Sequence, residues 1–85
     1  MKTIKVVIIT PDQVFLKSEA EFVVLPGIEG ELGILPEHTP LSTELKPGTV
    51  RLEHEGMSQR YVIAAGFAQI LPAEISIITT MARKV

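Results

Sequence analysis

The chain has 85 residues, no cysteine and a formal net charge of −2, which limits it to one small domain held together by packing alone. Without cysteine it has neither a disulfide framework nor a thiolate metal site. Its charges are spread along the chain and its only aromatic residues are Phe15, Phe22, Tyr61 and Phe67, which excludes the basic face and the stacking platform of a nucleic-acid-binding protein.

The apolar segments are too short for a membrane protein. The best apolar run covers residues 6–9, whereas a spanning helix needs about 20 apolar residues. The cationic start at Lys2 and Lys5 is followed too soon by Pro11 for a signal peptide. We therefore expect no direct membrane insertion and a cytoplasmic domain.

Short segments rich in Val, Ile, Thr and Phe fill the chain, separated by Gly or Pro. This pattern is typical of an all-β sandwich or barrel. In chain order, the expected strands cover residues 2–10, 14–16, 20–25, 31–35, 41–45, 50–55, 59–65, 67–71 and 74–80. No apolar stripe of helical period is sustained, and only residues 81–85 offer a helix start. The sequence predicts nine or ten short strands in a two-layer sandwich or flattened barrel.

Two features of the later strands carry further expectations. Gly66 interrupts a strand pattern, which indicates a bulge or a close approach of another backbone. In the last strand Ile75 and Ile77 face one side and Ile78 the other. We therefore expect this strand to be covered on both faces.

Residues 26–40 combine glycines, prolines, acids and a histidine, and the flanking strands are the expected scaffold for this loop. Gly27, Gly30 and Gly33 are spaced by three, and Pro36 and Pro40 close its far end. A phosphate cradle is disfavoured, because it needs a glycine turn that opens a helix. We interpret the glycines as residues with positive φ in tight turns.

Glu29 and Glu31 are separated by one residue, so an extended segment would point both to the same side. Acid–base catalysis is disfavoured, because no nucleophile or oxyanion donor accompanies them. Two interpretations stay open: solvated acids on an exposed edge, or an electrostatic contact with a basic partner.

His38 lies between Pro36 and Pro40. A zinc site is disfavoured, since only one other histidine, His54, is present and the ligand spacing is wrong. A histidine in such a loop binds backbone carbonyls or docks a partner. The serines lack a nucleophile elbow, so we expect no catalytic residue, metal or cofactor, and interpret the chain as a non-enzymatic binding module.

Three segments, residues 21–41, 45–52 and 65–72, closely resemble the epsilon subunit of F-type ATP synthase. The most specific is Gly-Glu-Leu-Gly-Ile-Leu-Pro-Glu-His-Thr-Pro at residues 30–40. The resemblance covers essentially the whole chain in the same order. It implies a ten-stranded β-sandwich, the amino-terminal domain of that subunit.

The resemblance also implies a function. The chain would be a non-catalytic central-stalk (rotor) subunit of the F1 sector, on the cytoplasmic face of the bacterial inner membrane, that helps couple proton flow to ATP synthesis. It would bind the gamma subunit and the c-ring. We assign Thr10, His38 and Leu41 to the gamma contact, and Glu29, Glu31 and Leu32 to the c-ring contact.

The chain departs from the family pattern in two ways. Where the family usually has Gly and Ala around the loop histidine, this chain has Glu37 and Thr39. The usual subunit also continues into a two-helix carboxy-terminal domain. We expect residues 1–85 to form a single domain without those helices, and therefore to have neither the inhibitory arm nor a nucleotide site.

Two other classes of function serve as alternatives. A lipoyl or biotinyl carrier domain has a similar size and an all-β fold, but Lys46 lies in Leu-Lys-Pro-Gly, which does not match the modified-lysine motif. A free-standing enzyme would need a catalytic constellation that the sequence does not contain.

Overall fold

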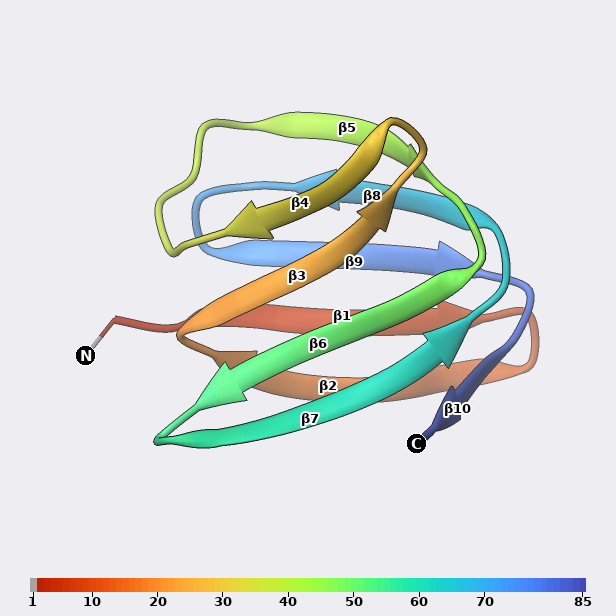
Figure 1. Ribbon diagram of the computed structural model, residues 1–85, viewed down its shortest axis with the longest axis horizontal. Coiled ribbons are helices and arrows are strands. Elements are labelled where there is room, and N and C mark those ends of the chain that lie inside the picture. The colour runs from red at the N-terminus through yellow and green to blue at the C-terminus, as the bar shows by residue number, and fades with distance from the viewer. Residues whose placement is uncertain (1) are drawn as a thin grey trace.

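The computed structural model describes residues 2–85, which form ten β-strands (Figure 1). The strands are β1 (Ile4–Thr10), β2 (Gln13–Ala20), β3 (Phe22–Gly27), β4 (Gly30–Ile34), β5 (Leu41–Leu45), β6 (Gly48–His54), β7 (Met57–Ile63), β8 (Gly66–Ile70), β9 (Glu74–Thr79) and β10 (Ala82–Lys84). The described part of the chain contains no helix. The prediction of an all-β fold is confirmed.

The strands form one continuous sheet that wraps into a nearly closed sandwich. Its order is β10-β7-β6-β3-β5-β8-β9-β1-β2, with β4 paired to the other edge of β3. In Figure 1, β4, β3, β6 and β7 cross in front of β5, β8, β9, β1 and β2. We call these the front and back layers, and β10 extends the front layer beside β7. The pairing of β1 with β9 is parallel, and the other pairings are antiparallel.

The core lies between the two layers and is built from alternate residues of each strand, as the period of two requires. Ile4, Val6 and Ile8 of β1 are fully buried, as are Ile75 and Ile77 of β9. The sequence assigned the two isoleucines of β9 to one face, and this is confirmed. Their neighbour Ile78 points outward and is 54% exposed, so the chain itself does not cover β9 on both sides.

Tyr61 is the one aromatic residue in the buried core cluster of the described residues. Its ring meets Phe15 edge to face at 6.0 Å between centroids, and its hydroxyl donates to the side-chain oxygen of Gln59 at 3.0 Å. Burial raises the pKa of Tyr61, since desolvation disfavours the phenolate.

Gly66 is required by a close approach of the backbone. A Cβ at this position would lie 2.2 Å from the carbonyl oxygen of Ile78 on the neighbouring strand. The close-approach alternative predicted from the sequence is therefore confirmed.

Residues 81–85, which offered a helix start, form no helix, because β10 pairs with the edge of β7 and the N–H of Val85 donates to the carbonyl of Arg60. The predicted length of the second strand was wrong. The second strand is longer than residues 14–16 and reaches Ala20. Its polar residues face solvent at the edge of the sheet, so they do not end the strand.

Candidate functional site

The glycines of residues 27–33 shape a tight hairpin, but only one of them does so through positive φ. Gly30 has φ 138°, whereas Gly27 and Gly33 do not have positive φ. A Cβ on Gly27 would lie 2.6 Å from the Gly30 carbonyl oxygen, and one on Gly33 would lie 3.0 Å from the ring of Phe22. The prediction of positive φ at all three positions was wrong for two of them, where close packing excludes a side chain.

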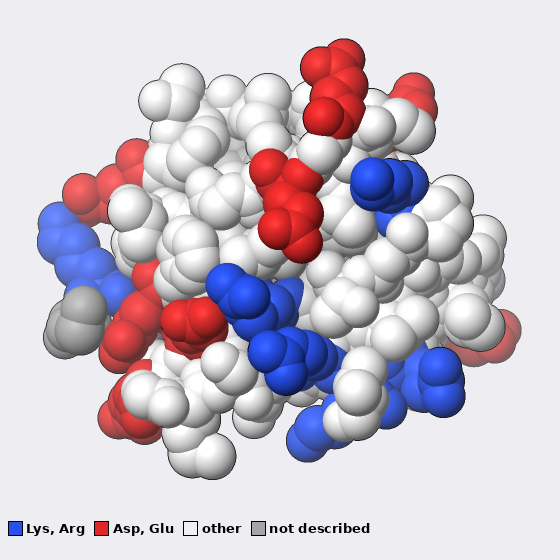
Figure 2. All heavy atoms as spheres, in the orientation of Figure 1, with Lys and Arg blue, Asp and Glu red and all other residues white. Residues whose placement is uncertain are grey.

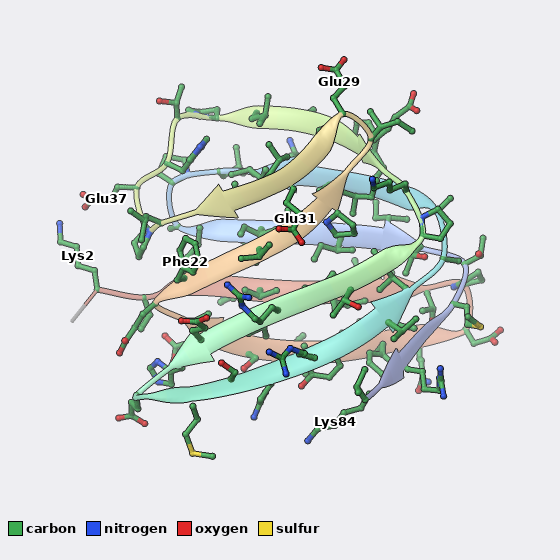
Figure 3. All side chains as sticks on the ribbon, in the orientation of Figure 1. Lys2, Phe22, Glu29, Glu31, Glu37 and Lys84 are labelled. Atoms are coloured by element: carbon green, nitrogen blue, oxygen red, sulfur yellow. The ribbon has the colours of Figure 1, made fainter. Side chains whose placement is uncertain are left out.

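The acids at this hairpin diverge instead of pointing to one side as predicted. Figure 3 shows Glu29 projecting from the tip, while Glu31 extends over the outer face of the front layer. Glu29 lies in the turn, where the alternation of a strand does not apply, and Glu31 lies in β4 opposite Pro26. Leu32 pairs with the buried Leu25 and is half-buried. The hairpin therefore presents two exposed carboxylates in different directions.

The segment between β4 and β5 is fixed by backbone hydrogen bonds. The N–H of Glu37 donates to the Pro72 carbonyl at 2.8 Å, and that of His38 to the Leu35 carbonyl at 3.2 Å. His38 Nδ1 lies 2.6 Å from the Thr39 carbonyl oxygen, so Nδ1 carries a proton and donates. His38 thus binds backbone, which is one of the two roles expected for it.

Glu37 has φ 68°, a conformation that favours glycine. The resemblance implies glycine at this position, and a glycine would adopt this φ without strain. Lys2 and Glu37 extend toward one another (Figure 3), with 2.6 Å between Nζ and Oε2. Both side chains are mostly exposed, so this pair stabilises the strained position only weakly.

The three residues assigned to the gamma contact do not form one cluster. His38 belongs to the segment that bonds to Pro72, at the turn between β8 and β9. Thr10 ends β1 at the opposite end of β9, since Ile9 pairs with Ile78. Leu41 lines a groove with the c-ring set, Glu29, Glu31 and Leu32. The residues assigned to gamma therefore lie at both ends of the back layer.

An apolar row crosses the outer face of the back layer. The pairs Phe67–Ile78, Ile78–Ile9 and Ile9–Val14 place four apolar side chains side by side on four strands. Phe67 is 43% exposed, Ile78 54% and Val14 49%. Three of these side chains, Ile9, Phe67 and Ile78, line a groove of about 540 Å³, and Thr10 lines it too. We call Phe67, Ile78, Ile9 and Val14 the apolar row.

Sequence reasoning identified only Ile78 of this row. The other members depend on the register of four strands, including the parallel pairing of β1 with β9, which no local pattern encodes. The available signal was that Phe67, Ile9 and Val14 each lie next to a residue that points into the core.

Charge is unevenly distributed over the opposite face. Figure 2 shows Lys and Arg side chains gathered over β6, β7 and β10, with acidic side chains above them toward the hairpin. Arg51 and Arg60 lie directly opposite one another in the register, an arrangement that costs stability. Arg51 Nε lies 3.0 Å from the Glu53 carboxylate, which partly offsets this cost.

The described residues contain no group of three or more His, Cys, Asp or Glu placed to hold a metal. No helix in this part of the chain is long and apolar enough to cross a membrane. Lys46 follows β5, and its N–H donates to the Pro26 carbonyl. It joins β5 and β6, which are not paired with each other, so it is not at the hairpin tip that a carrier domain requires.

Comparison with known proteins identifies the family. Residues 3–85 match the family described as the beta-sandwich domain of the ATP synthase delta/epsilon chain. The ATP synthase epsilon chain of Desulforamulus reducens is 41% identical over 83 residues, which cover 98% of this chain and 63% of that protein. The chain therefore spans less than two thirds of this relative.

Two solved structures have the same fold. A chain in a cryo-EM structure of the mitochondrial ATP synthase of Euglena gracilis, which includes its F1 sector and c-ring, gives a TM-score of 0.89 at 28% identity, over 96% of this chain and 53% of that one. A chain in the central stalk and c-ring structure from Tetrahymena thermophila gives 0.76 at 15% identity, over 95% and 66%, and shows the fold alone. The family match over residues 3–85 and the 41% identity with the Desulforamulus reducens epsilon chain show that this chain belongs to the β-sandwich domain family of the ATP synthase delta and epsilon chains.

Proposed function

We propose that this chain is a non-catalytic rotor subunit in the central stalk of a proton-translocating ATP synthase, where it binds the gamma subunit and the c-ring. Catalysis belongs to other subunits of the complex. The place of action is the cytoplasmic face of the bacterial inner membrane, as a peripheral component. The observation that carries the proposal is the apolar row on the outer face of the back layer.

The apolar row has the properties of a protein-binding surface. Single exposed apolar side chains are common on soluble proteins, but a contiguous set beside a groove marks an interaction site. Here the set spans β8, β9, β1 and β2, and Thr10, assigned to gamma from the resemblance, lines the same groove. We therefore assign the outer face of the back layer to the gamma subunit.

The acidic hairpin is the proposed contact with the c-ring. Glu29 and Glu31 are exposed and project from a hairpin held rigid by close glycine packing. Exposed carboxylates on a rigid support favour a basic partner and increase its rate of association. Glu31 lies on the front layer and the apolar row on the back layer, so one small domain has separate surfaces for two partners.

The test of the gamma contact is binding of purified gamma subunit to the chain and to two variants. Ile78→Glu places a charge in the middle of the apolar row, and we expect binding to weaken at least about tenfold, since a desolvated charge is costly. The matched control is Gln69→Glu, an exposed position on the same face in the next row, and this variant should bind gamma almost as tightly as wild type. Equal affinity of wild type and Ile78→Glu for gamma would refute the assignment of the back layer to the gamma subunit.

The test of the c-ring contact uses vesicles that contain the c-ring and capture the complex of this chain with gamma. Glu31→Arg reverses the charge at an exposed position, so the fold and gamma binding should persist while capture falls by about two- to fivefold or more. Glu55→Arg, at an exposed position in the turn between β6 and β7 of the same layer, away from the hairpin, is the control. Unchanged capture of the Glu31→Arg complex would count against a c-ring contact at this hairpin.

A further inference from the structure

The sandwich is open along one side, between β4 in the front layer and β5 in the back layer. Within residues 2–85, β4 pairs with β3 alone, and β5 meets β3 only at the pair Gly27–Leu45. A groove of about 430 Å³ follows this opening, lined by residues 27–32 together with Leu41 and Thr43. The groove thus runs beside an edge strand.

The backbone of β4 has unused hydrogen-bonding groups along the groove. Gly27 and Gly30 close a two-residue turn and pair with each other, so Gly30, Leu32 and Ile34 bond to β3. The N–H and C=O groups of Glu31 and Gly33 then point away from β3. Pro26, opposite Glu31, has no N–H to offer, and Glu31 and Gly33 are both exposed.

This edge has no Lys, Pro or bulge, three of the devices that block strand addition, and its one charged residue is Glu31. The sequence of β4 is Gly-Glu-Leu-Gly-Ile, and its register with β3 is unbroken. The two terminal strands of the sheet have such devices: β10 contains Arg83 and Lys84, and the ladder of β2 has an irregularity opposite Ile8 and Ile9. The edge of β4 has neither, and it faces the largely unpaired edge of β5 across the groove.

The lining of the groove indicates what kind of segment would fit. Leu32 and Leu41 give it an apolar floor, while Glu29 and Glu31 are its charged residues and no Lys or Arg lines it. A strand added beside β4 would alternate its side chains as β4 does. Residues opposite Glu31 would lie on the outer face near a carboxylate, and residues opposite Leu32 would face the apolar floor.

We propose that β4 is a strand-addition site for an extended segment of a partner polypeptide in which basic and apolar residues alternate. The backbone of the segment pairs with Glu31 and Gly33, its apolar side chains lie between Leu32 and Leu41, and its cations lie beside Glu29 and Glu31. Affinity comes from main-chain hydrogen bonds and specificity from alternate side chains. This inference goes beyond the proposed function, because it adds main-chain pairing along β4 and requires neither gamma nor the c-ring, although it uses Glu29, Glu31 and Leu32, which are also assigned to the c-ring contact.

The test uses the full chain and a capped hexapeptide of alternating Lys and Val, with a Glu and Val hexapeptide as charge control. We expect saturable binding of the basic peptide below about 1 mM and slower exchange of the Glu31 and Gly33 amide hydrogens, followed by NMR. The acidic peptide should bind at least about fivefold more weakly, since its carboxylates repel Glu29 and Glu31.

Backbone pairing is tested separately from charge. Two further basic peptides are N-methylated, one at the odd and one at the even residues, and one of the two should lose about tenfold in affinity, because only one set of N–H groups faces β4. On the protein, Glu31→Pro removes an outward N–H that an edge strand can spare, and Glu31→Gln keeps it. Glu31→Pro should bind the basic peptide more weakly than Glu31→Gln does. If Glu31→Pro does not fold, the two N-methylated peptides test the backbone pairing on their own.

Several results would overturn the proposal. These are no saturable binding of the basic peptide, equal binding of both methylated peptides, or slowed exchange along β2 or β10 in place of β4. None of them would affect the proposed rotor function, which rests on side-chain contacts. A failure to bind gamma would likewise leave a positive peptide result intact.

Discussion

Glu37 has a side chain at a position whose backbone conformation favours glycine, and this conformation has a cost. Its φ of 68° is one of two positive values at non-glycine residues in the described chain. Such a conformation costs roughly 1–2 kcal/mol for a residue with a Cβ. A glycine there would avoid the strain but would lose more entropy on folding.

Two variants of Glu37 test the backbone strain, because both remove the charge and they differ in how well they tolerate positive φ. Glu37→Gly should change the free energy of unfolding by less than about 1 kcal/mol, since relief of strain and loss of entropy nearly cancel. Glu37→Val should lower it by about 1–2 kcal/mol, because a β-branched residue is least tolerant of positive φ. Denaturant unfolding of both variants measures this. Equal free energies of unfolding for Glu37→Gly and Glu37→Val would contradict backbone strain at this position.

Tyr61 predicts how stability depends on alkaline pH. Its pKa is raised in the folded chain, so the unfolded chain loses its proton first as pH rises. Above about pH 10, the ordinary value for tyrosine, the folded state binds more protons, and stability falls until the folded pKa is reached. Tyr61→Phe should remove this part of the decline, measured by unfolding at several pH values.

Because Tyr61 is the single tyrosine and the chain has no tryptophan, its ionisation can also be followed directly by ultraviolet absorbance. The raised pKa would be contradicted if Tyr61 in the folded chain ionised at the ordinary tyrosine value. It would also be contradicted if the stability of Tyr61→Phe declined with alkaline pH as much as that of wild type.

At the scale of the strands, most elements could be predicted from the sequence and their partners could not. Alternation and turn residues located β1, β3 and the strands from β4 to β9 within a few residues. β10 escaped prediction because residues 82–84 have no strand signal of their own and are held by the edge of β7. The divergence of Glu29 from Glu31 was not predicted. Residues 28–29 form the turn, and β4 begins at Gly30, one residue before the strand expected from the sequence.

The close approach of β8 and β9 at Gly66 predicts a severe effect of a single methyl group. In Gly66→Ala the new Cβ would overlap the Ile78 carbonyl oxygen, so β8 and β9 must move apart, at a cost of about 2–3 kcal/mol. The control is Gly56→Ala, where a Cβ has open space and φ is 77°, with an expected cost of about 1 kcal/mol. Denaturant unfolding compares them, and an equal loss in both would rule out the contact with Ile78.

At the scale of the whole molecule, the sandwich separates its surfaces by character. The outer face of the back layer has the apolar row at one end and Lys5, Glu19 and Glu74 paired across its other end. The front layer bears the acidic hairpin and the basic residues over β6, β7 and β10 (Figure 2). The resemblance in residues 21–41 pointed to the family, but the apolar row required the three-dimensional register.

Binding of the gamma subunit to the back layer is the step on which the proposed function depends, and the mass of the complex in solution measures it. Purified gamma and this chain would be mixed and analysed by size-exclusion chromatography with light scattering, and the complex then tested for capture on c-ring vesicles. We expect a one-to-one complex, and we expect the vesicles to retain this chain only when gamma is present. Separate elution of the two proteins at micromolar concentration would contradict it.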